Sequence, residues 1–170
     1  MLISFSGLPG AGKTTIARTL AEDIRAVHLR IDSVENAIRA SGVVPIGREL
    51  DDAGYRVAYA LAEDNLRLGH IVISDCVNPI ALTRDAWLTV ARAAAVPIVE
   101  VEIVCSDLSE HRRRVETRPS PFESLENVTW QAVVDREYHK WARGVLVIDT
   151  AKHTVPEAVN ILRDATATTR

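Results

Sequence analysis

A short glycine-rich motif near the N-terminus constrains the fold of this chain more than any other feature. Residues Gly7–Thr14 read Gly-Leu-Pro-Gly-Ala-Gly-Lys-Thr and satisfy the pattern G-x-x-x-x-G-K-[ST]. The apolar run Leu2–Ser6 precedes the motif, and Thr14–Ile24 follows it with apolar residues at helical spacing. A strand, a glycine-rich turn and a helix in this order predict an α/β fold that begins with a phosphate-binding loop.

The residue types of this motif fit the phosphates of a nucleotide. Glycines allow successive backbone N–H groups to approach phosphate oxygens, because no Cβ stands in the way. Lys13 brings a positive charge to the β- and γ-phosphates, and the Thr14 hydroxyl is a ligand for Mg²⁺. We therefore expect ATP and Mg²⁺ to bind here. The predicted nucleotide-binding residues of the loop are Gly7, Leu8, Pro9, Gly10, Ala11, Gly12, Lys13, Thr14 and Thr15.

The rest of the chain alternates short β-rich runs with longer helical ones. The predicted strands are Leu2–Ser6, Val27–Ile31, His70–Ser74, Pro97–Val104 and Val145–Ile148. The predicted helices are Thr14–Ile24, Asp32–Ala40, Asp51–Leu68, Pro79–Ala94, Ser106–Arg118, Thr129–Trp141 and Val155–Ala165. This alternation predicts a five-stranded parallel sheet covered by helices on both faces.

Length, charge and hydropathy narrow the class of protein. A chain of 170 residues is predicted to form a single domain, 1–170. A net charge of −3 argues against a general nucleic-acid or anionic-membrane binder, since no excess positive charge displaces counterions. No apolar run approaches the ~18 residues that span a bilayer, so the expected compartment is the cytoplasm. The oligomeric state stays open between monomer and homodimer.

Four segments together resemble a known group of enzymes. They are GLPGAGKTT at Gly7–Thr15, HLRIDS at His28–Ser33, VISDCVNP at Val72–Pro79 and HRRRVETR at His111–Arg118. In these segments the chain resembles the small P-loop kinases that include polynucleotide 5′-kinase, chloramphenicol phosphotransferase, gluconate kinase and adenylylsulfate kinase. The resemblance covers most of the chain and implies the P-loop three-layer sandwich, with the strand order 2-3-1-4-5.

The end of the second predicted strand carries the candidate catalytic base. The resemblance implies that Asp32 accepts the proton of the acceptor hydroxyl, and a carboxylate beyond the γ-phosphate is suited to this task. The alternative is that Asp32 only caps the following helix. The family often places an arginine at the third residue on, where this chain has Glu35. Glu35 either favours a neutral or cationic acceptor or lies on a solvated helix face.

Asp75 ends the third predicted strand and is the candidate second anchor for Mg²⁺. The resemblance also allows Asp75 to contact acceptor hydroxyls, so the choice of base between Asp32 and Asp75 stays open. Asn78 and Arg84 follow in a pattern similar to a D-x-x-N…R segment of these kinases, which implies contact with the acceptor. For Arg84 a surface position on the helix is an equal alternative.

Two arginines one helical turn apart precede a proline-containing segment. The resemblance implies that Arg114 packs on adenine and that Arg118 reaches the phosphates as a catalytic residue beside Lys13. The segment over about 118–127 is then expected to form a short lid that excludes water. Thr150, after the last strand, stands where such kinases contact adenine through backbone atoms.

These features together predict an ATP-dependent kinase that transfers the γ-phosphate to a hydroxyl of a small-molecule acceptor. The predicted acceptor-binding residues are Asp32, Glu35, Asp75, Asn78 and Arg84. Two other classes remain as alternatives, a P-loop NTPase and a non-catalytic nucleotide-binding module. The sequence contains no motif that names the acceptor.

Overall fold

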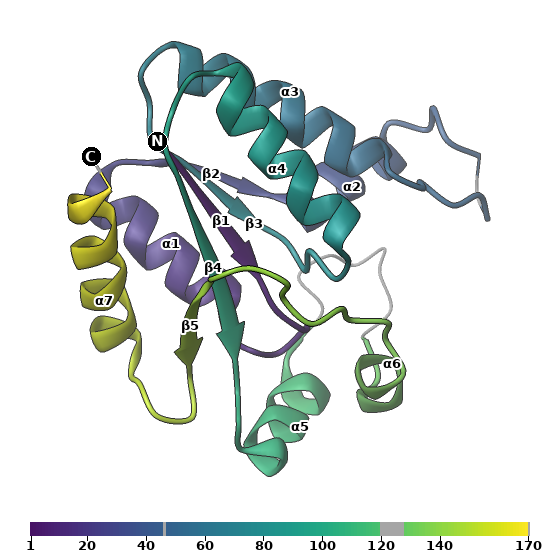
Figure 1. Cartoon of the computed structure of the whole chain (residues 1–170). Coiled ribbons are helices and arrows are strands. Elements are labelled where there is room, and N and C mark those ends of the chain that lie inside the picture. The colour runs from purple at the N-terminus through teal and green to yellow at the C-terminus, as the bar shows by residue number, and fades with distance from the viewer. Residues whose placement is uncertain (46, 120–127, 170) are drawn as a thin grey trace.

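The central element of the protein is a five-stranded parallel sheet (Figure 1). The structure is a computed structural model and describes residues 1–45, 47–119 and 128–169. The strand order is β2-β3-β1-β4-β5, as the sequence predicts. The strands are β1 (Leu2–Ser6), β2 (Val27–Arg30), β3 (Val72–Asp75), β4 (Ile98–Val104) and β5 (Leu146–Asp149).

The glycine-rich loop follows the most deeply buried position of this sheet. Strand β1 lies between β3 and β4, and all five of its residues are buried. A strand that is covered on both faces needs a continuous apolar run rather than an alternating pattern, and LISFS is close to such a run. The buried strand therefore gives the loop a rigid base.

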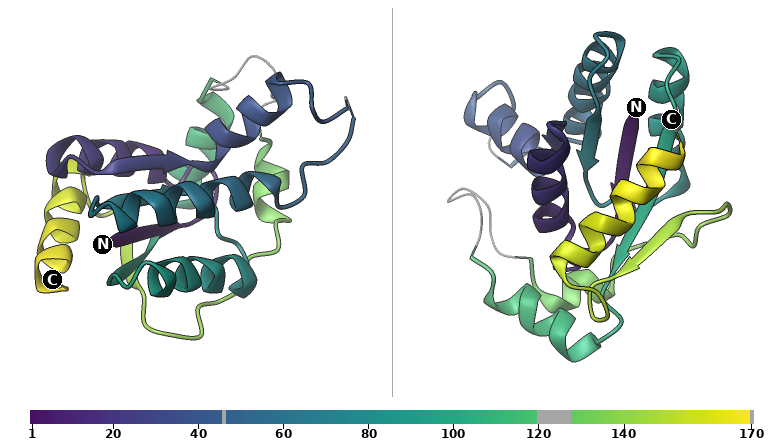
Figure 2. Two further views of the ribbon diagram at one scale, coloured as in Figure 1. Left: turned by 90° about the horizontal axis from the view of Figure 1, so that it is seen from above. Right: turned by 90° about the vertical axis from the view of Figure 1, so that its left-hand side faces the viewer.

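Seven helices are present in the described part of the chain. They are α1 (Lys13–Ile24), α2 (Ile31–Ala40), α3 (Ala53–Arg67), α4 (Ala81–Ala93), α5 (Leu108–Thr117), α6 (Trp130–Val134) and α7 (Val155–Thr168). Helices α1 and α7 pack on one face of the sheet, and α3 and α4 pack on the other (Figure 2). This arrangement is the predicted three-layer sandwich.

Two apolar clusters, one on each face, hold the layers together. On the first face, Ile16 and Leu20 of α1 and Leu162 of α7 meet side chains from the sheet such as Phe5. On the second face, the indole of Trp87 in α4 is fully buried. Burial of this apolar surface is the main favourable contribution to folding.

Helices α5 and α6 lie beyond the carboxyl ends of β1 and β4, so they stand beside the glycine-rich loop (Figure 1). Ligands of parallel α/β sheets bind at this end of the strands. Asp107 caps α5 by accepting hydrogen bonds from the backbone N–H groups of Ser109 and Glu110, at 3.0 Å each. The two helices therefore border the end of the sheet at which a ligand is expected to bind.

Two predictions about helices differ from the structure. The predicted helix Thr129–Trp141 ends at Val134, because the backbone N–H of His139 donates to the Pro79 carbonyl instead of continuing a helix. The apolar positions of the predicted helix Asp51–Leu68 are Val57, Leu61, Leu66 and Leu68, and of these only Leu66 is buried. The buried face of α3 is instead formed by Gly54, Ala58, Ala62 and Leu66.

No helix in the described ranges is both long enough and apolar enough to cross a membrane.

Candidate nucleotide and acceptor site

The glycine-rich loop has the backbone shape that a phosphate cradle requires. Gly7 has φ 138° and Gly12 has φ 104°, and side chains rarely adopt these values. A Cβ at Gly7 would overlap the carbonyl oxygen of Ile103 in β4. Gly12 is the N-cap of α1 and offers no capping side chain. The N–H groups of the first helical turn are therefore available to an anion.

Lys13 is a buried cation at the floor of this loop. Its side chain is only 8% exposed, and its ammonium donates a hydrogen bond to the Leu8 carbonyl at 2.9 Å. Burial lowers its pKa to about 8, although Asp75 and Asp32 act in the opposite direction. Among the described residues no carboxylate forms an ion pair with this ammonium. A buried cation without an anionic partner fits the β- and γ-phosphates of a nucleotide.

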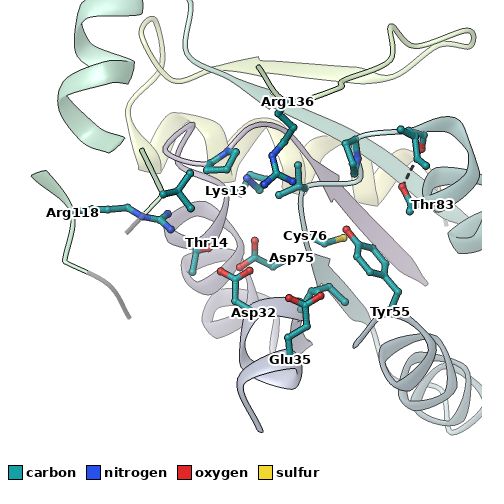
Figure 3. A pocket seen from close by; sticks show the side chains of 16 residues that line it. Lys13, Thr14, Asp32, Glu35, Tyr55, Asp75, Cys76, Thr83, Arg118 and Arg136 are labelled. Atoms are coloured by element: carbon teal, nitrogen blue, oxygen red, sulfur yellow. Dashed lines mark hydrogen bonds between the residues drawn. The ribbon is translucent and has the colours of Figure 1, made fainter. Parts of the chain in front are cut away.

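Three adjoining cavities follow the loop. The first, of about 310 Å³, contains Asp32, Glu35, Tyr55 and Asp75 among its lining residues (Figure 3). The second, of about 300 Å³, shares Lys13, Thr14 and Arg118 with the first. The third, of about 440 Å³, shares Gly12, Thr15 and Arg114 with the second and extends to Thr150–Val155. The loop is therefore bordered by one row of spaces from Asp32 to Thr150.

The expected metal side of the site contains Asp75 and Thr14. Asp75 is almost fully buried, and its carboxylate lies 3.2 Å from Nε2 of His28. Burial opposes its ionisation, but the hydrogen bond from His28, the charge of Lys13 and the hydroxyl of Thr14 lower the pKa of Asp75 below its ordinary value. An ionised carboxylate beside a hydroxyl fits Mg²⁺, which takes few protein ligands and keeps phosphate oxygens and water.

Within residues 1–45, 47–119 and 128–169, no group of three or more His, Cys, Asp or Glu side chains is arranged to hold a metal ion by itself. A Mg²⁺ ion at Thr14 and Asp75 would therefore depend on the phosphates for its remaining ligands.

Asp32 lies in the first cavity on helix α2, across from Thr14 (Figure 3). The alternative that Asp32 caps this helix is wrong, since the N-cap is Arg30 and no side chain makes a capping bond. Asp32 instead accepts a hydrogen bond from the Arg30 guanidinium at 2.9 Å, and its side chain stays 47% exposed. The carboxylate is thus oriented by Arg30 and accessible from the cavity.

Arg114 and Arg118 stand at different points of the row of cavities. The guanidinium of Arg114 donates to the Thr150 hydroxyl at 2.9 Å and to Glu110 at 2.8 Å, between the second and third cavities. Arg118, the C-cap of α5, lines the first and second cavities. Most of the predicted lid, 120–127, lies outside the described residues.

Asn78 and Arg84, which the sequence predicts to contact the acceptor, do not line any of these three cavities. The Asn78 side chain is fully buried; its amide donates to the Phe5 carbonyl at 2.8 Å and accepts from the Trp87 indole at 3.1 Å. The buried guanidinium of Arg84 donates to the carbonyls of Asn78 and His139 and lies 4.3 Å from the Trp141 ring centroid. Both residues hold the wall behind the site.

Sequence reasoning missed several residues around the loop. Arg136 and Tyr55 line the first cavity, and no motif contains either of them. His111 places its Nε2 2.8 Å from the Pro9 carbonyl and so supports the loop from behind. Only tertiary packing brings these residues together, because they come from α3, α5 and the segment after α6.

Comparisons with known proteins agree with this architecture. The model of a family described as an AAA domain matches residues 2–137, which is most of the chain. A curated relative, a probable adenylyl-sulfate kinase of Pseudomonas aeruginosa, is 35% identical over 88 residues, covering 48% of this chain and 39% of the relative. The chain thus spans about two fifths of the length of the curated relative it matches.

Two solved structures resemble the whole chain. The Mycobacterium tuberculosis APS kinase CysC, in complex with AMPPNP and APS, is 19% identical with a TM-score of 0.75, covering 98% of this chain and 96% of that one. Kti12 of Chaetomium thermophilum, in complex with ADP-AlF3, is 24% identical with a TM-score of 0.68, covering 97% and 98%. The chain therefore belongs to the AAA domain family, and its fold is that of the small P-loop kinases.

Proposed function

We propose that this protein is a kinase that uses ATP and Mg²⁺ to phosphorylate a hydroxyl of a small molecule. The observation that carries the proposal is the junction of the first two cavities. Lys13, Thr14 and Arg118 line both spaces, and Asp32 lies in the first cavity beyond them. A phosphoryl group at this junction would stand between cationic side chains and a carboxylate, which is the arrangement that phosphoryl transfer requires.

Each cavity has a role in this proposal. The third receives the adenine, next to Arg114 and Thr150. The second receives the phosphates, which replace the Leu8 carbonyl as the partner of the Lys13 ammonium. Thr14 and Asp75 hold Mg²⁺, which neutralises charge on the phosphate oxygens. The acceptor occupies the first cavity, whose volume of about 310 Å³ is at the small end of ligand sites.

Asp32 is the better candidate for the base. Asp75 is already engaged by His28 and is assigned to the metal, whereas the Asp32 carboxylate is open to the acceptor cavity. As the acceptor oxygen bonds to the γ-phosphorus, its proton passes to Asp32 and the bond from that phosphorus to the β–γ bridging oxygen breaks. Lys13 and Arg118 stabilise the charge that builds on the phosphoryl oxygens and on the departing ADP.

Replacement of the base separates this proposal from simple nucleotide binding. We expect Asp32→Asn to leave the affinity for ATP nearly unchanged and to lower kcat for acceptor phosphorylation by about 10²–10⁴-fold. The measurement is ADP release with and without a panel of sugars, polyols, nucleosides and hydroxyamines, together with nucleotide titration. Asp64→Asn, at an exposed position of α3, is the matched control.

The same assay tests the alternative of a P-loop NTPase. Slow ATP hydrolysis that no acceptor accelerates, in the wild type, would favour an NTPase. Full turnover by the Asp32→Asn variant would remove Asp32 from the mechanism.

A further inference from the structure

The first cavity is divided by charge. Asp32 and Glu35, one turn apart on α2, lie on one side, and Arg118 and Arg136 enter from the other (Figure 3). Lys13 and Arg118 also line the second cavity, so they belong to the phosphates. Arg136 lines only the first of the three cavities and faces Asp32 and Glu35 across it, so this space has one cationic wall and one carboxylate wall. A group of the acceptor that binds at Asp32 and Glu35 lies at the carboxylate wall.

Glu35 is the carboxylate of this cavity that has no hydrogen-bonding or ion-pairing partner within residues 1–45, 47–119 and 128–169. Asp32 is paired with Arg30, and Asp75 with His28. Among the described residues, Glu35 makes neither a hydrogen bond nor an ion pair; it feels only the more distant charges of Asp32, Arg39 and Arg136. Burial, and then the neighbouring Asp32, raise the pKa of Glu35 above its ordinary value. A positive group of a ligand beside Glu35 would stabilise its ionised carboxylate.

The fold provides a specific place for the Glu35 side chain. Its Cγ packs directly over Gly54 in the first turn of α3, where a Cβ would overlap it. Glycine is unfavourable inside a helix, and the φ of Gly54 is one that other residues also adopt. The close approach of the Glu35 side chain is therefore the structural reason for a glycine at position 54. Gly54 thereby lets α2 and α3 approach closely and holds the stem of Glu35 at the wall of the cavity.

We propose that the acceptor is an amino alcohol or amino sugar, whose protonated amine binds the Glu35 carboxylate while its hydroxyl faces Asp32. This inference rests on the proposed kinase function. Residues three apart on a helix have neighbouring side chains, so the amine and the hydroxyl are separated by a few bonds. The apolar residues Ile31, Val77 and Ile80 line the same cavity and can cover the carbon skeleton between the two groups. An acceptor as anionic as adenylyl sulfate would bring negative charge towards Glu35.

Two matched series of compounds test the charge preference. The first is 3-aminopropanol, 1,3-propanediol and 3-hydroxypropanoate; the second is glucosamine, glucose and glucuronate. Binding to the complex of the protein with AMPPNP and Mg²⁺ is measured by ligand-observed NMR titration, which does not depend on turnover. We expect the cationic member of at least one series to bind about tenfold or more tightly than its neutral and anionic counterparts.

Two variants connect this preference to Glu35. Glu35→Gln should abolish the preference for the amine and leave AMPPNP affinity unchanged. Gly54→Ala should weaken amine binding by displacing the Glu35 side chain, with the same unchanged nucleotide affinity. Glu22→Gln, on the exposed face of α1, is the matched control and should behave as the wild type.

The outcomes separate the two proposals. Equal binding of all three charges, preference for the anion, no saturable binding of either amine, or a preference that survives in Glu35→Gln each overturns the amine assignment. If an amine binds through Glu35 but ATP yields no phosphorylated product from it, the charge assignment holds and the kinase function fails for that compound. If only a neutral compound is phosphorylated, the kinase function holds and the amine assignment fails.

Discussion

At the scale of single residues, the environment of Lys13 most directly links structure to ligand binding. The ammonium is buried and forms no ion pair with a carboxylate of the described residues. Its pKa is about 8 instead of 10.5. The folded protein therefore binds fewer protons than the unfolded chain between about pH 8 and 10.5, and the contribution of this group to stability rises with pH across that window. At neutral pH the burial costs roughly 3 kcal/mol, which an anionic ligand can offset.

This pKa predicts that nucleotide binding takes up a proton at alkaline pH. Phosphates beside Lys13 restore the charged form, so AMPPNP binding should take up a larger fraction of a proton at pH 8.5 than at pH 7. Calorimetry in buffers of different ionisation enthalpy measures this fraction. Lys13→Arg, which stays charged, should lose the pH 8.5 uptake; the same uptake in that variant would assign the proton to another group.

At the scale of elements, the turn between β3 and α4 is held by Asn78 and Arg84. Asn78, at φ 44°, joins this turn to the end of β1 through the Phe5 carbonyl and to α4 through Trp87. Arg84 continues the connection to the segment that carries Arg136, through the His139 carbonyl and the rings of Tyr138 and Trp141. The wall of the first cavity therefore depends on a network whose side chains do not line that cavity.

Asn78→Ala is predicted to lower the free energy of unfolding by about 3 kcal/mol. The substitution leaves the Phe5 carbonyl and the Trp87 indole N–H without their partner and places alanine at a positive φ. Urea denaturation measures the loss. Asn65→Ala on the exposed side of α3 is the control and should change stability by less than ~0.5 kcal/mol. A fully stable Asn78→Ala protein with weakened acceptor binding would return Asn78 to the acceptor site.

Local and tertiary information explain which predictions were right. The loop Gly7–Thr14 and the parallel sheet could be predicted, because short stretches of sequence contain the glycine pattern and the alternation of strands and helices. The strand order could be predicted only through the resemblance to the small P-loop kinases. The end of α6 at Val134 could not, since it depends on Pro79 and Arg84 far away in the chain. The buried face of α3 is made of small residues such as Ala58 and Ala62, which carry little periodic signal.

At the scale of the whole molecule, the three cavities extend along the carboxyl end of the sheet from the β2 side to the β5 side. The first is lined from α2 and α3, on the β2 side, and the third from the residues after β5 at the other edge. The loop after the central strand β1 lies between them. A nucleotide bound along the loop would therefore contact elements from α1 to the turn before α7, and its binding energy would add to the stability of the folded state as a whole.

AMPPNP with Mg²⁺ is therefore predicted to raise the melting temperature by roughly 5–10 °C at a concentration of about 100 times its Kd. Thermal denaturation followed by circular dichroism measures the shift. Lys13→Met, which removes the cation of the cradle, should show little or no shift at the same concentration. A comparable shift in this variant would place the nucleotide elsewhere on the protein.

The shared lining of the cavities also has a consequence for inhibitor design. Because the first two cavities share Lys13, Thr14 and Arg118, two ligands bound in the proposed way would lie end to end. A bisubstrate compound, with adenosine joined to an amino alcohol through a polyphosphate chain, matches this layout. Once its adenosine end is bound, the amine end meets its cavity at an effective concentration in the millimolar range for a short flexible link. The chain length that gives the highest affinity would then report the distance between the adenine and the acceptor.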